Sequence, residues 1–203
     1  MKGLKIERFE TTTNHSTIQQ DKVRSTVQQK FAEQIFGGKM KRFIIAALVE
    51  NKYGVLTRVA GLFMRKGFNI DSLTVGETED SSFSRITITL RGDDNDKDQL
   101  ISQLRKLHNV TYVKHIDEKN SVERELILIK VKNTVQNRSE IMAITEIYRA
   151  KIVDYNPKTI CVVMTGKPSK INAFIEILRP LGIVELCRTG VVAIERNKAI
   201  YNV

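Results

Sequence analysis

The polar residues best suited to bind a ligand lie between an apolar run and the helical pattern that follows it. The continuous apolar run at 43–49 predicts a buried strand, and apolar residues recur at helical spacing from Val55 to Phe63. Asn51 and Gly54 lie in the connection. An asparagine side chain carries both donors and an acceptor, so it can hold an ammonium or a carboxylate group. A glycine lets another molecule approach the backbone closely.

A small amino acid fits the chemistry of this connection. The amino end of the predicted helix offers free N–H groups and a positive dipole end, which attract a carboxylate. Asn69 and Ile70, at the start of the next predicted strand, could add a second amide and an apolar wall. These groups suit an amino acid with a small branched side chain. The alternative is an ordinary strand-to-helix turn punctuated by Gly54, and the residues alone leave both interpretations open.

The apolar patterns around these residues predict the same order of elements twice. The first half has strands at 43–49, 68–75, 83–90 and 110–116, with helices at 55–63 and from Asp93 onward. The second half repeats the order with strands at 125–131, 152–155, 160–164 and 183–186, helices at 139–148 and 168–178, and a last strand at 191–194. Ser139 is the expected N-cap of its helix. The pattern predicts an α+β protein with two ferredoxin-like βαββαβ domains.

Patterns typical of catalysis are missing from the sequence. It contains no GxGxxG, GxxxxGK[ST], HExxH or GxSxG segment. The three histidines are scattered, and the acidic run at 93–98 lacks the glycine and the final glutamate of a calcium loop. We therefore expect a binding module with no catalytic residues and no metal site.

Composition bears on compartment and organisation. No stretch of about 18 apolar residues is present, so we expect no membrane span. Cys161 and Cys187 form no CxxC pair and lie in apolar runs, which predicts two buried free thiols in a reducing, cytoplasmic compartment. Residues 1–38 mix basic and acidic side chains, read as a flexible extension with a short amphipathic pattern at 23–35. A plastid address for this segment stays open as an alternative.

The basic charge raises a second possibility for function. The net charge is +10, and residues 119–203 carry 14 Lys/Arg against 8 Asp/Glu. Such a surface could face nucleic acid or an acidic protein, or it could be ordinary solvated surface charge. An amino-acid-responsive transcriptional regulator is therefore the alternative, although no helix-turn-helix segment is evident and acids are interspersed among the basic residues. We expect no nucleic-acid partner.

Two long ungapped motifs add a family resemblance. The first half resembles the ACT domain of acetolactate synthase small subunits, and the second half resembles the C-terminal domain of that family. The motifs are Glu50-Asn51-x-x-Gly54-Val55-Leu56-x-Arg58-Val59-x-Gly61-Leu62-Phe63, Arg65-x-Gly67-Phe68-Asn69-Ile70-x-Ser72-Leu73-Thr74-Val75, Ser84-Arg85, Val122-Glu123-Arg124-Glu125 and Arg188-Thr189-Gly190-Val191-Val192. The match covers about residues 40–197. Tyr53 stands where the family often has proline.

The resemblance implies a regulatory subunit in branched-chain amino acid biosynthesis. Such a subunit binds a separate catalytic chain, which uses thiamine diphosphate, magnesium and FAD, and needs no cofactor of its own. It raises the activity of that chain and confers allosteric feedback inhibition by valine or a related amino acid. Family ACT domains form a homodimer with the effector between protomers. Carried over residue by residue, Asn51, Gly54, Val55, Asn69 and Ile70 would line the valine site.

The resemblance and the pattern together suggest that the two halves of the chain have different roles. Residues 39–118 would form the ACT domain that binds the effector, and residues 119–203 the βαββαβ domain that activates the catalytic subunit. Residues 117–122 are the expected linker between them.

Overall fold

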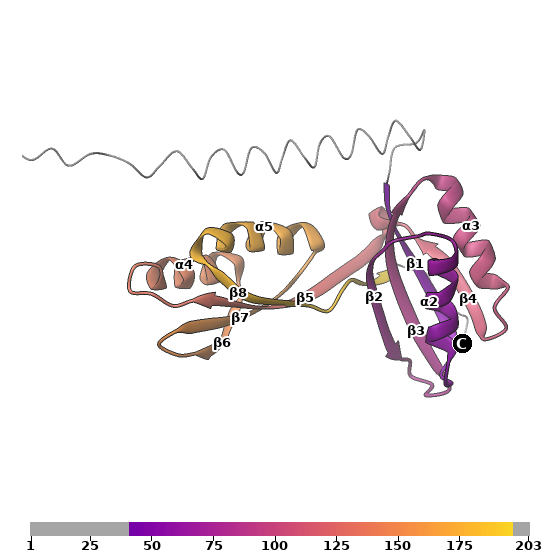
Figure 1. Cartoon of the computed structure of the whole chain (residues 1–203), viewed down its shortest axis with the longest axis horizontal. Coiled ribbons are helices and arrows are strands. Elements are labelled where there is room, and N and C mark those ends of the chain that lie inside the picture. The colour runs from indigo at the N-terminus through magenta and orange to yellow at the C-terminus, as the bar shows by residue number, and fades with distance from the viewer. Residues whose placement is uncertain (1–40, 197–203) are drawn as a thin grey trace, which may run out of the picture. The chain divides into compact units, whose positions relative to one another are not determined.

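The computed structural model describes residues 41–196 (Figure 1). The predicted extension at 1–38 and its amphipathic pattern lie outside these residues. The described chain folds into two antiparallel sheets, each with two α-helices, within one compact unit. The predicted α+β architecture with two βαββαβ repeats is confirmed.

The first sheet has the strand order β2-β3-β1-β4, which leaves β2 at one edge. Its β1 pairs along its length with β3, with Glu50 opposite Phe83 and Phe43 opposite Leu90. Because β2 and β1 both run antiparallel to β3, they are parallel to each other on its two sides. The elements are β1 (Lys41–Glu50), α2 (Val55–Arg65), β2 (Ile70–Glu77), β3 (Phe83–Gly92), α3 (Asp94–Arg105) and β4 (Val110–Ile116).

Local sequence explains where the first two helices begin and end. Asp93 caps α3 by accepting a hydrogen bond from the backbone N–H of Asp96, whose side chain accepts one from the N–H of Asp93. This reciprocal capping box satisfies two N–H groups that the helix cannot satisfy itself. The acidic run at 93–98 is therefore a helix start, which agrees with the helix predicted from Asp93 onward. Gly67, with φ +72°, follows the last turn of α2.

Alternating residues of β1 face opposite sides of the first sheet. Phe43, Ile45 and Val49 pack with the apolar sides of α2 and α3 in the first core. Ile44, Ala46 and Leu48 point to the other side, where they are buried as well. The residues that cover them come from the far end of the sequence, namely Val191 and Ala193. Burial on both faces explains why β1 reads as an uninterrupted apolar run.

The second sheet repeats the first in its strand order, β6-β7-β5-β8. Helices α4 and α5 cover one face of it, where the inward residues of β5 and β7 are fully buried. Figure 1 shows both helices on the same side of these strands. The elements are β5 (Ser121–Lys132), α4 (Arg138–Tyr148), β6 (Lys151–Tyr155), β7 (Thr159–Gly166), α5 (Pro168–Leu178) and β8 (Ile183–Arg188).

The predicted N-cap of α4 is wrong. The helix begins one residue earlier, at Arg138, and its cap position is Asn137 rather than Ser139. The Asn137 side chain instead closes the preceding turn, because its Oδ1 accepts from the N–H of Thr134 and its amide donates to the carbonyl of Lys132.

The predicted linker is shorter than the sequence pattern suggested. Residues Glu118–Asn120 form a single 3₁₀ turn, and β5 already begins at Ser121. Its first four residues pair with β9 (Val192–Glu195), whereas its later residues lie in the second sheet (Figure 1). The strand was predicted to begin at 125 because the residues before it are mostly polar. The two-stranded ribbon formed by 121–124 and 192–195 packs on the first sheet through Val191 and Ala193.

The two cysteines are free thiols, as expected, but neither is fully buried. Cys161 is half-buried and Cys187 is exposed, so the prediction of two buried thiols is wrong. The strand of Cys187, β8, is an edge strand, and Cys187 lies opposite Leu128, which is itself exposed on the face away from α4 and α5. No described element covers that face at this position.

Candidate effector site

Asn51 lies just beyond β1, where it joins the end of that strand to the turn between β2 and β3. Its amide Nδ2 donates to Glu77 Oε1 at 2.9 Å and to the carbonyl of Ser81 at 3.0 Å. Its backbone N–H donates to the carbonyl of Ser82 at 2.7 Å. Both amide protons are therefore used. The acceptor Oδ1 receives no hydrogen bond from the described residues, so it is the atom that can meet a donor from a ligand.

Gly54 is required by its backbone conformation rather than by crowding. Its φ is +78°, a region that strains residues with a side chain, and a Cβ built there would meet nothing within 4 Å. The glycine is the cap position of α2, and no side chain caps that helix. No acidic residue lies in the first turn either. The first-turn N–H groups are therefore open toward a ligand and favour an anion.

Val55 is the first residue of α2, and its side chain points inward. It is 4% exposed and belongs to the core between the sheet and the two helices. Its backbone N–H makes only a long contact, 3.4 Å, to the carbonyl of Lys52. If Val55 takes part in ligand binding, it does so through this N–H group and not through its isopropyl group.

Asn69 and Ile70 do not lie beside Asn51 within one chain. Ile70 is opposite Leu90 on β3, whereas the last residue of β1, Glu50, is opposite Phe83. Seven residues of extended strand separate these positions, a distance of about 23 Å at roughly 3.3 Å per residue. The structure thus brings Asn51, Gly54 and Val55 together at one end of the sheet and places Asn69 and Ile70 toward the other end.

Ionised carboxylates flank the Asn51 connection. A hydrogen bond from the Asn109 side chain lowers the pKa of Glu50, and Lys52 and His108 lower it further electrostatically. Glu77 accepts the amide of Asn51. This end of the sheet therefore combines negative charge beside Asn51 with the positive end of a helix at Gly54, and the zwitterion of an amino acid carries the complementary pair of charges.

Comparison with known proteins identifies the family. A family model described as the AHAS small subunit-like ACT domain matches residues 45–112, and one described as the small subunit of acetolactate synthase matches 124–197. The chain is 53% identical over 153 residues to a probable acetolactate synthase small subunit of Archaeoglobus fulgidus, covering 75% of this chain and 96% of that one. It is 45% identical over 168 residues to the small subunit of Aquifex aeolicus, covering 82% and 88%.

The chain belongs to the acetolactate synthase small-subunit family. A solved structure of the small subunit from Thermotoga maritima matches with a TM-score of 0.73 and 42% identity, covering 78% of this chain and 99% of that chain. The membership confirms the resemblance seen in the sequence and favours a regulatory subunit over the alternative of a transcriptional regulator.

Residues from three of the family motifs form the contact between the first sheet and the segment that ends in β9. They are Thr74, Arg85 and residues 189–193. Thr74 Oγ1 lies 3.2 Å from the carbonyl of Thr189 and 3.3 Å from that of Val191. Arg85 donates to the carbonyl of Ala193 at 2.6 Å. A Cβ on Gly190 would lie 2.9 Å from Thr74 Oγ1, which leaves no room for a side chain there. Sequence reasoning recognised these residues as family motifs without placing them together.

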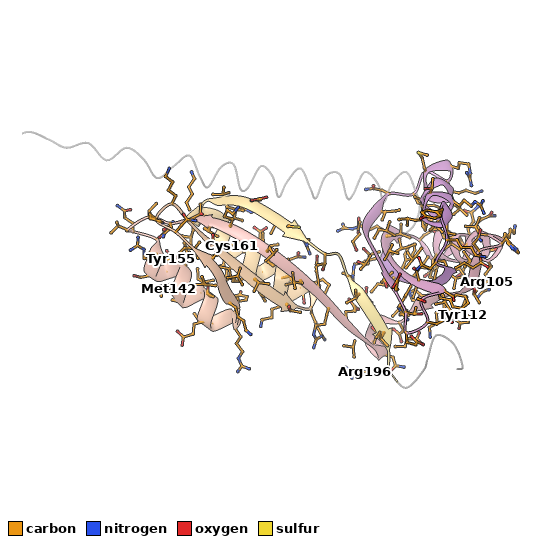
Figure 2. All side chains as sticks on the ribbon, turned by 90° about the horizontal axis from the view of Figure 1, so that it is seen from below. Arg105, Tyr112, Met142, Tyr155, Cys161 and Arg196 are labelled. Carbon is orange, nitrogen blue, oxygen red and sulfur yellow. The ribbon has the colours of Figure 1, made fainter. Side chains whose placement is uncertain are left out.

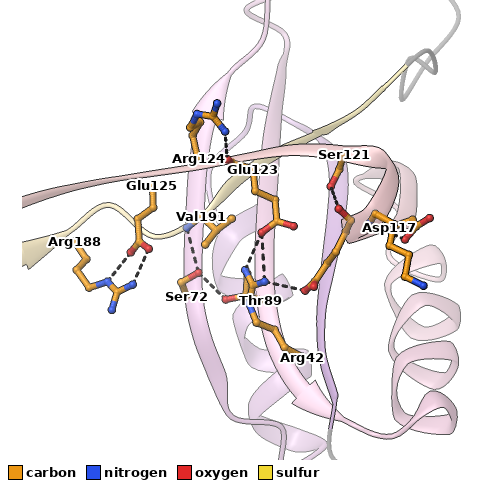
Figure 3. Close-up of polar contacts among 12 residues, drawn as sticks. Arg42, Ser72, Thr89, Asp117, Ser121, Glu123, Arg124, Glu125, Arg188 and Val191 are labelled. Atoms are coloured by element: carbon orange, nitrogen blue, oxygen red, sulfur yellow. Dashed lines mark hydrogen bonds and ion pairs between the residues drawn. The ribbon is translucent and has the colours of Figure 1, made fainter. Parts of the chain in front are cut away.

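Residues 189–195 run from β8 back to the first sheet, and this return segment is anchored at its start in the second domain. Arg188 makes a paired contact with both carboxylate oxygens of Glu125 at 2.6 Å, and the Glu125 side chain is only 2% exposed (Figure 3). This hydrogen bonding raises the pKa of the Arg188 guanidinium. On the other side of the ribbon, Arg42 of β1 bonds to Glu118 and Glu123. Ion pairs thus lie at both connections between the two halves, namely residues 117–121 and residues 188–192.

An apolar hollow beside this contact is the second place in the small subunit where a ligand could bind. It measures about 330 Å³ and is open to solvent. Its walls include Val75, Val122, Val192 and Ile194, with Arg85 and Arg124 at its border. Glu77, which accepts the Asn51 amide, also lines this hollow. Among the described residues, no group of three or more His, Cys, Asp or Glu could hold a metal ion.

No helix within residues 41–196 is long and apolar enough to cross a membrane.

Proposed function

We propose that this small subunit binds the separate catalytic subunit of acetolactate synthase, raises its activity and makes it sensitive to valine or a related branched-chain amino acid. The observation that carries the effector assignment is that Asn51, whose Oδ1 accepts no hydrogen bond within residues 41–196, lies just before α2, a helix with no side-chain cap. Thiamine diphosphate, magnesium and FAD belong to the catalytic subunit in this proposal, and the present chain needs none.

The geometry supports one orientation of the amino acid. Its ammonium group donates to Asn51 Oδ1, close to the carboxylate of Glu77, which the Asn51 amide already holds. Its carboxylate accepts from the N–H groups of the first turn of α2, where Gly54 leaves the backbone uncovered. Charged partners make these hydrogen bonds stronger than neutral ones.

A second copy of the chain completes the site. Strand β2 is the edge of the first sheet, so its outer backbone groups are open for pairing. If two copies pair antiparallel about a two-fold axis and overlap along the whole of β2, Ile70 of one copy lies opposite Glu77 of the other. Glu77 is the residue that contacts Asn51. Pairing therefore brings Asn69 and Ile70 of the partner subunit to the Asn51 end, although a single chain keeps them about 23 Å apart.

Feedback requires that the effector site and the activating domain influence each other. We assign effector binding to residues 39–118 and activation to residues 119–203. Strand β2, on which the dimer and the site depend, contacts the return segment through Thr74 and Ser72. That segment continues directly from Arg188, which is anchored in the second domain by Glu125. A shift of β2 on valine binding therefore acts on a segment that is covalently part of the activating domain.

The test is reconstitution from purified subunits. Acetolactate formation is measured for the catalytic subunit alone, with this chain, and with this chain plus valine. We expect this chain to raise the rate and valine to lower it only when this chain is present. An equal rate with and without this chain, or equal valine sensitivity of the catalytic subunit alone, would contradict the proposal. Leucine and isoleucine serve as comparison effectors, because a methylene difference changes binding by only about 1–3 kcal/mol.

A further inference from the structure

The second domain has an edge that corresponds to the dimerising edge proposed for the first. In the shared element order, α4 and β6 occupy the positions that α2 and β2 occupy in the first half. Both β2 and β6 end their sheets, in the orders β2-β3-β1-β4 and β6-β7-β5-β8. The chain thus carries two versions of one edge, and only the first is used by the proposed effector dimer.

The α4–β6 surface, formed by Met142, Ala143, Ile152, Val153 and Tyr155, is apolar and open. Met142 is 51% exposed, Val153 56% and Tyr155 51%. Met142, Ala143 and Ile152 also line an open hollow of about 640 Å³ between the helix and the strand. Figure 2 shows Met142 and Tyr155 in the same part of the second domain. Exposed apolar side chains gathered at one place mark a contact site rather than ordinary surface.

The form of β6 favours contact through side chains over strand addition. The strand has only five residues, all of them exposed, and its pairing with β7 is interrupted by an irregularity between Ile152 and Asp154. Short length, a bulge and charged residues are devices that prevent an edge from adding another strand. A partner therefore meets the apolar side chains of α4 and β6.

Basic residues border this surface. Arg149, Lys151 and Lys158 are exposed, and their side chains form no ion pair within residues 41–196. Arg138 lies over the Tyr155 ring, 5.9 Å from its centroid. The nearby acids are Glu140 and Glu146 of α4 and Asp154 of β6, against the four basic residues Arg138, Arg149, Lys151 and Lys158. Basic residues thus outnumber acidic ones around the apolar centre.

Arg149 has an unusual backbone conformation for its type. It ends α4 with φ +55°, the left-handed conformation for which glycine or asparagine is usual. It is the one residue other than glycine with a positive φ in the described part of the chain. Such a conformation costs free energy, and the Arg149 side chain makes no ion pair within residues 41–196 that would offset this cost, which directs attention to a contact outside this chain.

We propose that the α4–β6 surface docks the catalytic subunit of acetolactate synthase through an apolar projection bordered by carboxylates, an inference that rests on the function proposed above. Charge argues for this partner over a second copy. Two copies related by a two-fold axis would bring their basic borders together, in a chain with net charge +10. A partner with carboxylates at the border pairs with Arg149 and Lys151 instead.

The test compares Met142→Glu and Val153→Glu with Val184→Glu. Val184 lies on β8, the other edge of the same sheet, and its 52% exposure matches that of Met142. Affinity for the purified catalytic subunit is measured by titration, and valine binding by calorimetry. We expect Met142→Glu and Val153→Glu to weaken affinity about tenfold or more, with valine binding unchanged. Val184→Glu retains the affinity of the unmodified chain.

Arg149→Gly separates docking from folding. Glycine removes the strain of positive φ, so the melting temperature of this variant is expected to rise. Its affinity for the catalytic subunit is expected to fall, and the salt dependence of that affinity to weaken. Opposite signs in the two measurements cannot arise from a loss of folding.

Each remaining outcome has a defined meaning. If the unmodified chain neither binds nor activates the catalytic subunit, the proposed function fails. If the unmodified chain activates but the Met142, Val153 and Arg149 variants bind as it does, only the docking surface is wrong. If these variants keep their affinity for the catalytic subunit but sediment as an assembly with fewer copies than the unmodified chain, a second copy occupies the surface and the proposal is overturned.

Discussion

Replacing Asn51 by alanine tests the effector site at its central atom. The change removes Oδ1, which we assign to the ligand ammonium group, and the two amide bonds to Glu77 and Ser81. A hydrogen bond to a charged group contributes about 1.5–3 kcal/mol. Loss of the ammonium contact should therefore weaken valine binding by about 10- to 150-fold. The effect on stability should be smaller, because Asn51 is exposed and solvent replaces its bonds.

Calorimetry with valine measures the change, and thermal unfolding checks that the variant folds. Asn95→Ala is the matched control, since Asn95 is an exposed asparagine on α3, away from this connection. It should bind valine as the unmodified chain does. Equal valine affinity in Asn51→Ala and the unmodified chain would refute the assignment. The hollow lined by Val75 and Val122 would then be the next candidate for the ligand site.

Four further outcomes follow from the same geometry. The purified chain alone should form no acetolactate, which a turnover assay on homogeneous protein checks. Gly190→Ala should lower the free energy of unfolding by about 1–3 kcal/mol, because φ is +81° and its Cβ would lie 2.9 Å from Thr74 Oγ1; denaturant titration measures the change. Burial lowers the pKa of His115, so the folded state resists its protonation and stability should fall as pH drops below about 6.5; His115→Gln should flatten that slope in melting experiments. A fragment ending at Glu118 should bind valine without fully activating the catalytic subunit, and should melt below the whole chain because Ile44 and Leu48 lose their cover.

The sequence predicts most elements because each has a strong local signal. The acidic capping box at Asp93 and the glycine after α2 fix helix ends within a few residues, and α5 spans the predicted Pro168–Leu178. Apolar runs and alternation locate the strands of both sheets. Polar residues at the start of β5 gave no such signal, so the strand was expected only from residue 125, and residues 121–122 were assigned to the linker.

The candidate site was only partly predictable, because pairing register is a long-range property. Asn51, Gly54 and Val55 are neighbours in sequence, and the structure keeps them together at the start of α2. Asn69 is close to them in sequence but lies toward the other end of the sheet, since α2 carries the chain back along its length. No local pattern reveals that separation, nor the contact between Thr74 and residues 115 or more positions later.

The contact between β2 and the return segment limits how the proposed feedback can work. Two crossings join the halves, one at 117–121 and one at 188–192, and charged residues hold each. The first crossing follows β4, at the edge of the sheet opposite β2, whereas the second passes the side chains of β2 itself. A coupling of about 1–3 kcal/mol is typical of allosteric proteins, and the net contribution of a few hydrogen bonds is of that size. The bonds between Ser72, Thr74 and Arg85 and residues 189–193 are therefore sufficient in number to couple the proposed dimer edge to the second domain.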